Sequence, residues 1–248
     1  MTKQGGLGDN LYVAGYDLSG DIGSLSKING GPAALEVTGI NKSAPERLGG
    51  ERDGGMDFTA FFNKAAGQAH LRLGSLPTTD TIVTYCRGTT LGNSSAVMVG
   101  KQVNYDPSHG QDGSLTFGVS VQSTLYGLEW GRQLTAGKRS DTTATNGTSV
   151  DMLTGSTAFG LQAYLHVFSF TGTSCTVTIQ ESSDNGGGDA FAAVTGGAFT
   201  AATGVTSQRI ATAAGQTVER YLRVVTTGTF SECTFAVTVI RNDTAVVF

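Results

Sequence analysis

The stretch SSAVMVGKQVNYDPSHGQDGSLTFGVSVQS (94–123) shows the clearest pattern in the chain. From residue 114 onward, apolar and polar side chains alternate, which is typical of a β-strand with one buried and one solvated face. Turn residues in DPSHGQDG (106–113) precede this strand, so we expect a hairpin with a rather long loop. The apolar positions are Leu115, Phe117, Val119 and Val121, and the polar positions are Ser114, Thr116, Gly118, Ser120 and Gln122.

The first strand of this hairpin has one irregular position. Val97, Val99 and Val103 share one parity, and Lys101 falls on that same parity. Either the lysine stem reaches out of the apolar face, or a bulge at Gly100 turns Lys101 toward the wet face.

The composition of the whole chain favours an all-β protein. Of 248 residues, 36 are glycines and only 15% are charged, against a typical charged share of about 25%. This mix suits short strands joined by tight turns and suits long helices poorly. The formal net charge of −4 argues against a nucleic-acid-binding surface, which needs clustered Lys and Arg to neutralise phosphates.

The lack of a recognisable targeting signal, together with the cysteine usage, indicates folding in a cytoplasm. No apolar run approaches the ~20 residues that span a bilayer, and MTKQGGLGDN (1–10) lacks the apolar stretch of a secretory signal. We therefore expect no membrane partner. The odd number of cysteines (Cys86, Cys175 and Cys233) predicts small buried side chains with no disulfide framework.

The character of the sequence changes near residue 140, which predicts two domains, 1–140 and 150–248. All four prolines and the single Trp precede that point, and the polar stretch TAGKRSDTTATNGTS (135–149) has the composition of a linker. The second part contains about six or seven strand-like segments, typical of an antiparallel β-sandwich. In GLQAYLHVFSF (160–170) the alternation breaks, and either a bulge near Val167–Phe168 or a strand end covered on both sides explains it.

In the first part we expect a β-sandwich or barrel with one short helix. Strand character appears in 11–20, 33–40, 55–63 and 81–88. KSAPERLGG (42–50) predicts a single helical turn that begins at Ser43 and ends at Gly49. Apolar residues at spacings of four and three predict an amphipathic helix that Pro77 closes. These residues are Phe62, Ala66, Ala69, Leu73 and Leu76.

The motifs of common catalytic and metal sites are missing from the sequence. No GxSxG elbow occurs, and the three histidines match no metal-site spacing. SDNGGGD (183–189) predicts a tight turn. The acids of ERLGGERDGG (46–55) are mixed with arginines, which favours a subunit contact over paired catalytic carboxylates. The contact candidates are Glu46, Arg47, Arg52 and Asp53. We expect a protein that is not an enzyme and that holds no cofactor and no metal.

The order of elements over residues 10–135 resembles the major tail tube proteins of long-tailed bacteriophages. The phrases that carry the resemblance are SAPERLGG (43–50), DFTAFFN (57–63), TIVTY (81–85), DGSLTFGVSVQS (112–123) and YGLEWGRQL (126–134). The second part is similar to the extra β-sandwich that many of these proteins carry outside the tube.

This resemblance implies a structural subunit of the virion tail, assembled in the host cytoplasm. Six copies would form a ring, and stacked rings would form the channel for genome ejection. The implied partners are other copies of the chain, the tape measure protein, tail terminator or tip proteins, and DNA that passes without specific binding. The hairpin 94–123 would line the channel through Ser114, Thr116, Ser120 and Gln122. The N-terminal arm and the glycine-rich loops 19–31 and 49–55 would then join successive rings.

Two other interpretations remain open. One is another virion component, such as a head decoration or fibre protein. The other is a carbohydrate-binding β-sandwich, which requires exposed aromatic side chains. The aromatic pair Tyr126 and Trp130 could bind sugar, but we favour an anchor that packs the last strand of the domain onto its core.

Overall fold

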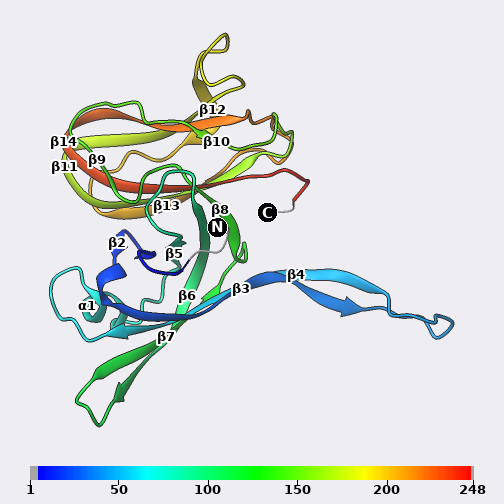
Figure 1. Cartoon of the computed structure of the whole chain (residues 1–248), viewed down its shortest axis with the longest axis vertical. Helices are drawn as coiled ribbons and strands as arrows, with labels where there is room; N and C mark the ends of the chain where they lie inside the picture. The colour runs from blue at the N-terminus through cyan, green and yellow to red at the C-terminus, as the bar shows by residue number, and fades with distance from the viewer. Residues whose placement is uncertain (1–4, 247–248) are drawn as a thin grey trace. The chain divides into compact units, whose positions relative to one another are not determined.

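Antiparallel β-strands dominate residues 5–246, the part of the chain that the computed structural model describes (Figure 1). The all-β class predicted from the composition is confirmed. Residues 1–4 of the predicted N-terminal arm lie outside the described range. The elements are β1 (Asn10–Val13), β2 (Tyr16–Asp17), η1 (Ser19–Asp21), β3 (Ile22–Glu36), β4 (Arg47–Phe61), α1 (Ala69–Leu73), β5 (Thr81–Cys86), β6 (Ser94–His109), β7 (Leu115–Ser123), β8 (Glu129–Gln133), β9 (Arg139–Asp141), β10 (Val150–Asp151), β11 (Leu161–Ser182), β12 (Ala192–Ala198), β13 (Thr206–Ala211) and β14 (Tyr221–Arg241).

The chain forms two compact units. The first contains the described parts of Met1–Gly20, Ile82–Val97 and Trp130–Phe248, and the second contains Asp21–Thr81 and Met98–Glu129. Each unit is described separately below.

The second unit is built on a sheet with the strand order β3-β4-β7-β6. Its apolar face follows from the alternation in β4 and β7, where every second side chain is buried. Phe58 pairs with Val119 and Met56 with Val121, and all four side chains are buried. Cross-strand apolar pairs of this kind stabilise a sheet, and each fully buried side chain contributes about 1.5–3 kcal/mol.

The predicted hairpin 94–123 is confirmed as β6 and β7. The two strands pair antiparallel from Gly100 opposite Ser123 to His109 opposite Leu115. The loop between them is closed by a hydrogen bond from the Gly110 N–H to the Ser114 carbonyl (2.9 Å).

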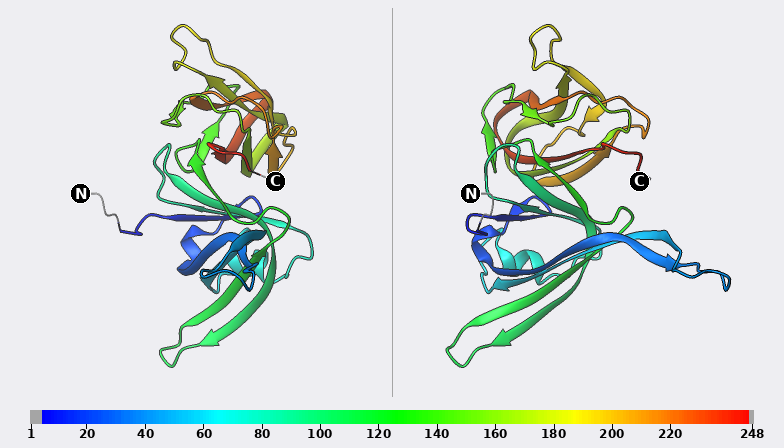
Figure 2. Two further views of the ribbon diagram at one scale, coloured as in Figure 1. Left: turned by 90° about the vertical axis from the view of Figure 1, so that its right-hand side faces the viewer. Right: turned by 45° about the vertical axis from the view of Figure 1, so that its right-hand side comes forward.

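A second, longer hairpin joins β3 and β4 and was not predicted. It pairs from Ile22 opposite Ala60 to Glu36 opposite Arg47. Its far half, residues 29–53, is paired only within itself, and nearly all of its side chains are exposed. In Figures 1 and 2 this half extends well beyond the rest of its unit as a two-stranded ribbon.

The predictions of a helical turn at 42–50 and of loops at 19–31 and 49–55 are therefore wrong. Residues 22–31 and 49–55 are strand, and 47–50 open β4. The glycines mark close packing here, because a Cβ atom on Gly54 would lie 2.6 Å from the Leu128 backbone nitrogen. A strand interior accepts glycine where another segment approaches its backbone this closely.

The predicted amphipathic helix is confirmed only at its centre. Helix α1 covers Ala69–Leu73, and both of its terminal residues are buried. Gly67 has a φ of +78°, so the chain turns before the helix can extend backward to Phe62. The Ala69 N–H donates to the buried Asp21 carboxylate (2.9 Å), which also accepts from the Asn63 side chain (2.8 Å).

In the first unit, β11 and β14 pair antiparallel over almost their whole lengths. Both strands bend near their middles, where the register shifts and where Gly172 and Gly228 have positive φ. Both halves of each strand contribute to one buried core, so the bent pair forms two layers around it. This core includes Leu161, Leu165, Val177, Ile179, Leu222, Val224, Phe235 and Val239. The sandwich contains segments that the sequence predicted as separate strands.

Two sequence predictions for this unit are confirmed. The β11 register shifts between Val167 and Ser169, which is the bulge predicted near Val167–Phe168. Cys86, Cys175 and Cys233 are free and buried, and burial raises the pKa of the Cys86 thiol to about 12. A thiol in such surroundings stays protonated and packs as a small apolar group.

The division into domains 1–140 and 150–248 stays a prediction, which two truncated proteins test. Residues 150–248 should fold alone, and residues 1–145 should retain assembly. In the structure β9 pairs with β14, and Leu134 is part of the sandwich core. We therefore expect residues 129–248 to be more stable toward urea than residues 150–248, by about 2–5 kcal/mol for the missing Leu134 side chain alone. If residues 129–248 and residues 150–248 are both unfolded when expressed alone, the predicted boundary is wrong.

Candidate assembly surfaces

One face of the β3-β4-β7-β6 sheet is polar, and it carries three of the four predicted channel residues. Thr116, Ser120 and Gln122 alternate along β7 with the buried Phe117 and Val119. Ser114 is exposed but precedes the strand, which begins at Leu115. Whether this face lines a channel stays a prediction.

Hydrogen bonds fix the side chains of this face across neighbouring strands. Ser120 pairs with Asp57 on β4 and Asn104 on β6, and its hydroxyl donates to the Asp57 carboxylate. Its N–H donates to the Asn104 Oδ1 atom (2.6 Å), and the Asn104 amide donates to the Asp106 carboxylate (2.7 Å). The centre of the face is thus polar and carries two carboxylates.

Lys101 belongs to this face, and no bulge at Gly100 puts it there. The pairing is regular from Gly100 to Gln102, with Lys101 opposite Gln122, and the register shifts only between Gln102 and Asn104. The Lys101 ammonium bonds the Asp80 carboxylate (2.7 Å) and the Thr78 carbonyl (3.0 Å). Gln102 turns inward instead and donates to the Leu73 carbonyl at the end of α1 (2.7 Å). A lysine in an ion pair with a neighbouring acid has little excess charge to offer a passing phosphate.

The open edges of this sheet are the second candidate surface. Among the described strands, β3 pairs with β4 alone and ends the sheet. Unpaired N–H and C=O groups on an edge strand are templates for pairing with another chain.

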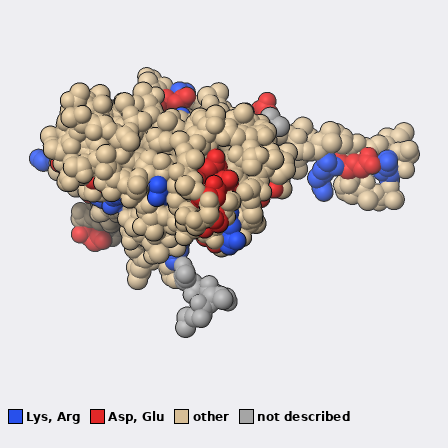
Figure 3. Space-filling model, turned by 90° about the horizontal axis from the view of Figure 1, so that it is seen from above, with Lys and Arg blue, Asp and Glu red and all other residues tan. Residues whose placement is uncertain are grey.

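The far half of the β3–β4 hairpin carries all four predicted contact residues. Glu46, Arg47, Arg52 and Asp53 are exposed. Glu46 pairs with Lys42 (2.9 Å) near the tip, and Asp53 accepts from the Ser123 hydroxyl (3.0 Å) at the base. The four residues share one hairpin but form no single cluster. Basic and acidic side chains alternate along the hairpin in Figure 3.

The same hairpin exposes apolar side chains that the sequence interpretation missed. Leu35 and Leu48 face each other across the two strands, and both are more than half exposed. Val37 and Ile40 follow at the tip, where Ile40 is fully exposed. A group of exposed apolar side chains on a projecting element indicates a contact surface. The alternation in AALEV (33–37) was the available signal, but only a strand at 33–40 was predicted from the sequence, and no exposed apolar surface.

In residues 5–246, no group of three or more His, Cys, Asp or Glu side chains lies close enough together to hold a metal ion. The SDNGGGD stretch is a turn in which the Asp184 carboxylate accepts backbone N–H bonds, which lowers the pKa of that carboxyl. His70 lies in α1, His109 ends β6, and His166 lies in β11.

Within the same residues, no helix has the length and apolar character needed to cross a bilayer.

Comparisons with known proteins give low similarity. No protein-family model and no curated protein matches the chain. Among solved structures, a chain from the virion of a native gene transfer agent particle aligns with 13% identity and a TM-score of 0.42, over 52% of this chain and 98% of its own. A chain from the tail of an empty gene transfer agent particle, refined with C6 symmetry, aligns with 15% identity and a TM-score of 0.40, over 51% and 98%.

The Dit protein of phage SPP1, a hub protein of the adsorption apparatus, aligns with 11% identity and a TM-score of 0.34, over 93% of this chain and 98% of its own. These neighbours come from virions and tail apparatus. At such TM-scores the similarity establishes neither a shared fold nor a shared function.

Proposed function

We propose that this chain is a structural subunit of a bacteriophage tail tube, whose copies form rings that stack around a channel for DNA. The observation that carries the proposal is the β3-β4-β7-β6 sheet, which has one polar face and an edge strand, β3, that pairs with β4 alone among the described strands. The role is structural, without catalysis or cofactor.

Ring closure would use the open sheet edges. Strand β3 pairs with β4 alone among the described strands, so its other side can pair with a strand of the next copy. Repetition of this contact around an axis joins the sheets into one closed wall, which leaves no edge exposed. Six copies per ring is the expectation from the sequence resemblance.

The polar face suits the inside of such a wall. Its central side chains are hydroxyl, amide and carboxylate groups, including Ser120, Asn104 and Asp57. Phosphate affinity comes from Lys and Arg, so a face of this kind lets DNA slide without binding it. The opposite face of the sheet is the buried, apolar one.

Stacking would use the far half of the β3–β4 hairpin. Its exposed leucines, Val37 and Ile40 can be buried against a subunit of the adjacent ring, at about 25 cal/mol for each Å² of apolar surface. The interspersed charges, such as Arg47 and Arg52, then select the partner surface by complementarity. Tape measure and terminator or tip proteins are the further partners of such a tube.

Positive charge added to the polar face tests the channel assignment. Phage particles assembled with the double variant Thr116→Lys, Gln122→Lys should release DNA at least tenfold more slowly at low salt, because every ring gains a belt of phosphate-binding ammonium groups. Dye fluorescence after triggered ejection measures the rate. Added salt should restore it.

The matched control is Thr116→Glu, Gln122→Glu, which changes the same positions and should leave release close to the wild-type rate. Equal release rates for both variants, in particles shown to contain them, would contradict the channel assignment.

A further inference from the structure

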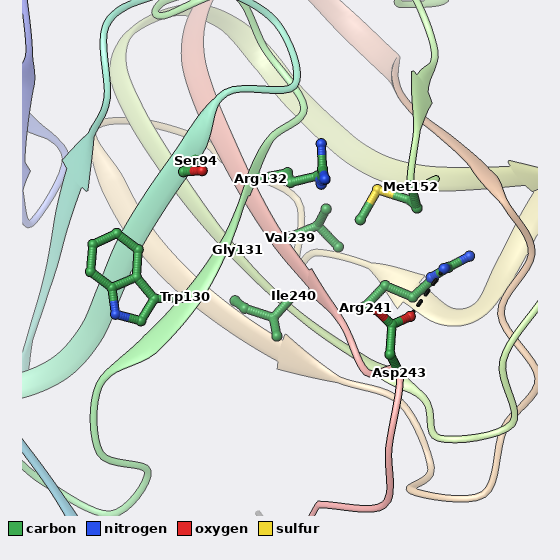
Figure 4. Close-up of a pocket in the computed structure, with 9 residues that line it drawn as sticks. All are labelled: Ser94, Trp130, Gly131, Arg132, Met152, Val239, Ile240, Arg241 and Asp243. Atoms are coloured by element: carbon green, nitrogen blue, oxygen red, sulfur yellow. Dashed lines mark hydrogen bonds and ion pairs between the residues drawn. The ribbon is translucent and has the colours of Figure 1, made fainter. Parts of the chain in front are cut away.

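A hollow of about 220 Å³ lies in the first unit, next to the only tryptophan of the chain (Figure 4). Its walls come from three strands and two following loops. Strand β6 contributes Ser94, β8 contributes Trp130 to Arg132, and β14 contributes Val239 to Arg241, while Met152 and Asp243 follow β10 and β14.

Trp130 is 56% exposed at the rim of this hollow. The expectation that it packs as a buried anchor is therefore wrong. In Figure 4 the indole stands on one side of Ile240, and the Arg241–Asp243 pair stands on the other. An exposed indole beside a hollow offers a flat apolar surface that no described side chain of this hollow covers.

The wall opposite Trp130 is a fixed polar structure. The Arg241 side chain is 1% exposed and donates to the Glu219 carbonyl (3.0 Å), the Thr154 carbonyl (3.3 Å) and Asp243 (3.2 Å). Asp243 also accepts from the Thr154 hydroxyl (3.0 Å), yet its side chain is 58% exposed. Its carboxylate is thus held in place and open to a ligand.

Arg132 offers further donors beside this wall. Among the described contacts its side chain makes one long hydrogen bond, to the Gly92 carbonyl (3.4 Å), and its charge helps to lower the pKa of Asp151. Guanidinium has five N–H donors in a rigid fork, so most of them remain for a ligand. The exposed Ser94 adds a hydroxyl next to them.

We propose that this hollow binds a saccharide, with one face of a sugar ring on the Trp130 indole and ring hydroxyls on Arg132 and Asp243. A sugar ring combines an apolar C–H face with a rim of hydroxyls, which matches one aromatic plane surrounded by fixed donors and acceptors.

Intrinsic fluorescence tests the site directly, because Trp130 is the sole tryptophan. Glucose, galactose, N-acetylglucosamine and glucuronate are titrated into the full-length protein, with glycerol as a polyol that lacks a ring. At least one sugar should change the emission with saturation in the millimolar range, while glycerol should not.

Variants locate the binding and need a second readout, such as saturation-transfer NMR of the bound sugar. Trp130→Ala and Arg132→Ala should each weaken binding about tenfold or more, and Trp130→Phe should retain most of it because the aromatic plane remains. Leu153→Ala, another exposed side chain of the same unit, should have no effect. Circular dichroism verifies that each variant is folded.

Three results would overturn the proposal. One is the absence of any saturable change with all four sugars, and another is binding that Trp130→Ala leaves intact. The third is an emission change that follows protein concentration and not sugar, because a second copy of the chain would then cover the indole. None of these results bears on whether the chain forms a tail tube.

Discussion

Removal of the far half of the β3–β4 hairpin should leave a folded protein that no longer stacks. The change deletes residues 32–52 and joins Gly31 to Asp53 through Asn-Gly, since these two residues already lie opposite each other. A two-residue Asn-Gly turn suits a hairpin of this geometry. The deleted segment contributes nothing to the buried core, so thermal unfolding should be almost unchanged.

The expected effect on assembly is large because the deletion removes the exposed apolar side chains of the far half, which are Leu35, Val37, Ile40 and Leu48. Sedimentation velocity should show that the concentration needed for tubes rises at least 100-fold, which is about 3 kcal/mol per contact. The matched control reverses the charges alone, with Arg47→Glu and Arg52→Glu, and should weaken stacking in a salt-dependent manner. Tubes of normal length and stability from the shortened chain would refute the stacking role.

Acidification should destabilise the first unit through His166. Its ring is buried, its Nδ1 atom accepts the Gly15 N–H (3.1 Å), and its Nε2 atom lies 2.9 Å from the Thr84 hydroxyl. Because an N–H can only donate, Nδ1 must be unprotonated, and the ring is neutral. Burial lowers the pKa of His166 from 6.5 to about 3.

The direction of the pH effect follows from this shift. The unfolded chain binds a proton below pH 6.5 and the folded chain does so only near pH 3, so stability is full above 6.5 and falls as the pH is lowered toward 3. The loss from this one group is about 2 kcal/mol at pH 5 and about 3 kcal/mol at pH 4.

Urea unfolding of wild type and His166→Gln between pH 4 and 7 isolates this contribution. At pH 7 the free energy of unfolding of His166→Gln should be lower than that of wild type. It should fall less as the pH is lowered, because the amide does not titrate. His109→Gln, at an exposed site in β6, is the matched control and should follow the wild-type curve. Parallel curves for wild type and His166→Gln would show that His166 does not titrate as inferred.

Strands with one buried face could be predicted from the sequence, and strands with two wet faces could not. The alternation of Phe117, Val119 and Val121 exists because the sheet buries one side of β7. The far half of the β3–β4 hairpin buries neither face. Only AALEV (33–37) alternates within it, and the glycine-rich stretches 19–31 and 49–55 were predicted as loops. Self-pairing of an exposed ribbon needs no apolar alternation, so the pairing of these two strands could not be predicted.

The long strands of the sandwich illustrate a second limit. A bulge at Phe168 could be predicted because the apolar parity switches there. The strand-like segment quoted from the sequence ends at residue 170, yet β11 continues through TGTS (171–174), since β14 bends with it and keeps the pairing. Whether a glycine ends a strand or bends it depends on its partner strand, which lies about 60 residues away in the sequence.

The polar face of the β3-β4-β7-β6 sheet could likewise be predicted only in part. The polar parity of β7 was visible, and the structure puts Thr116, Ser120 and Gln122 on one face. The register of β6 was not visible, because Gln102 turns inward for the Leu73 carbonyl and moves the bulge to Val103. The contact of Gln102 with helix α1 accompanies this shift in register, and the sequence around Gln102 does not predict that contact.

Electron microscopy of concentrated, purified full-length protein tests whether copies of the chain form a tail tube. We expect rings with a central channel that stack into tubes, with six-fold symmetry and with the β6–β7 hairpins on the channel wall. Particles that remain monomeric at every concentration, or filaments without a channel, would contradict it.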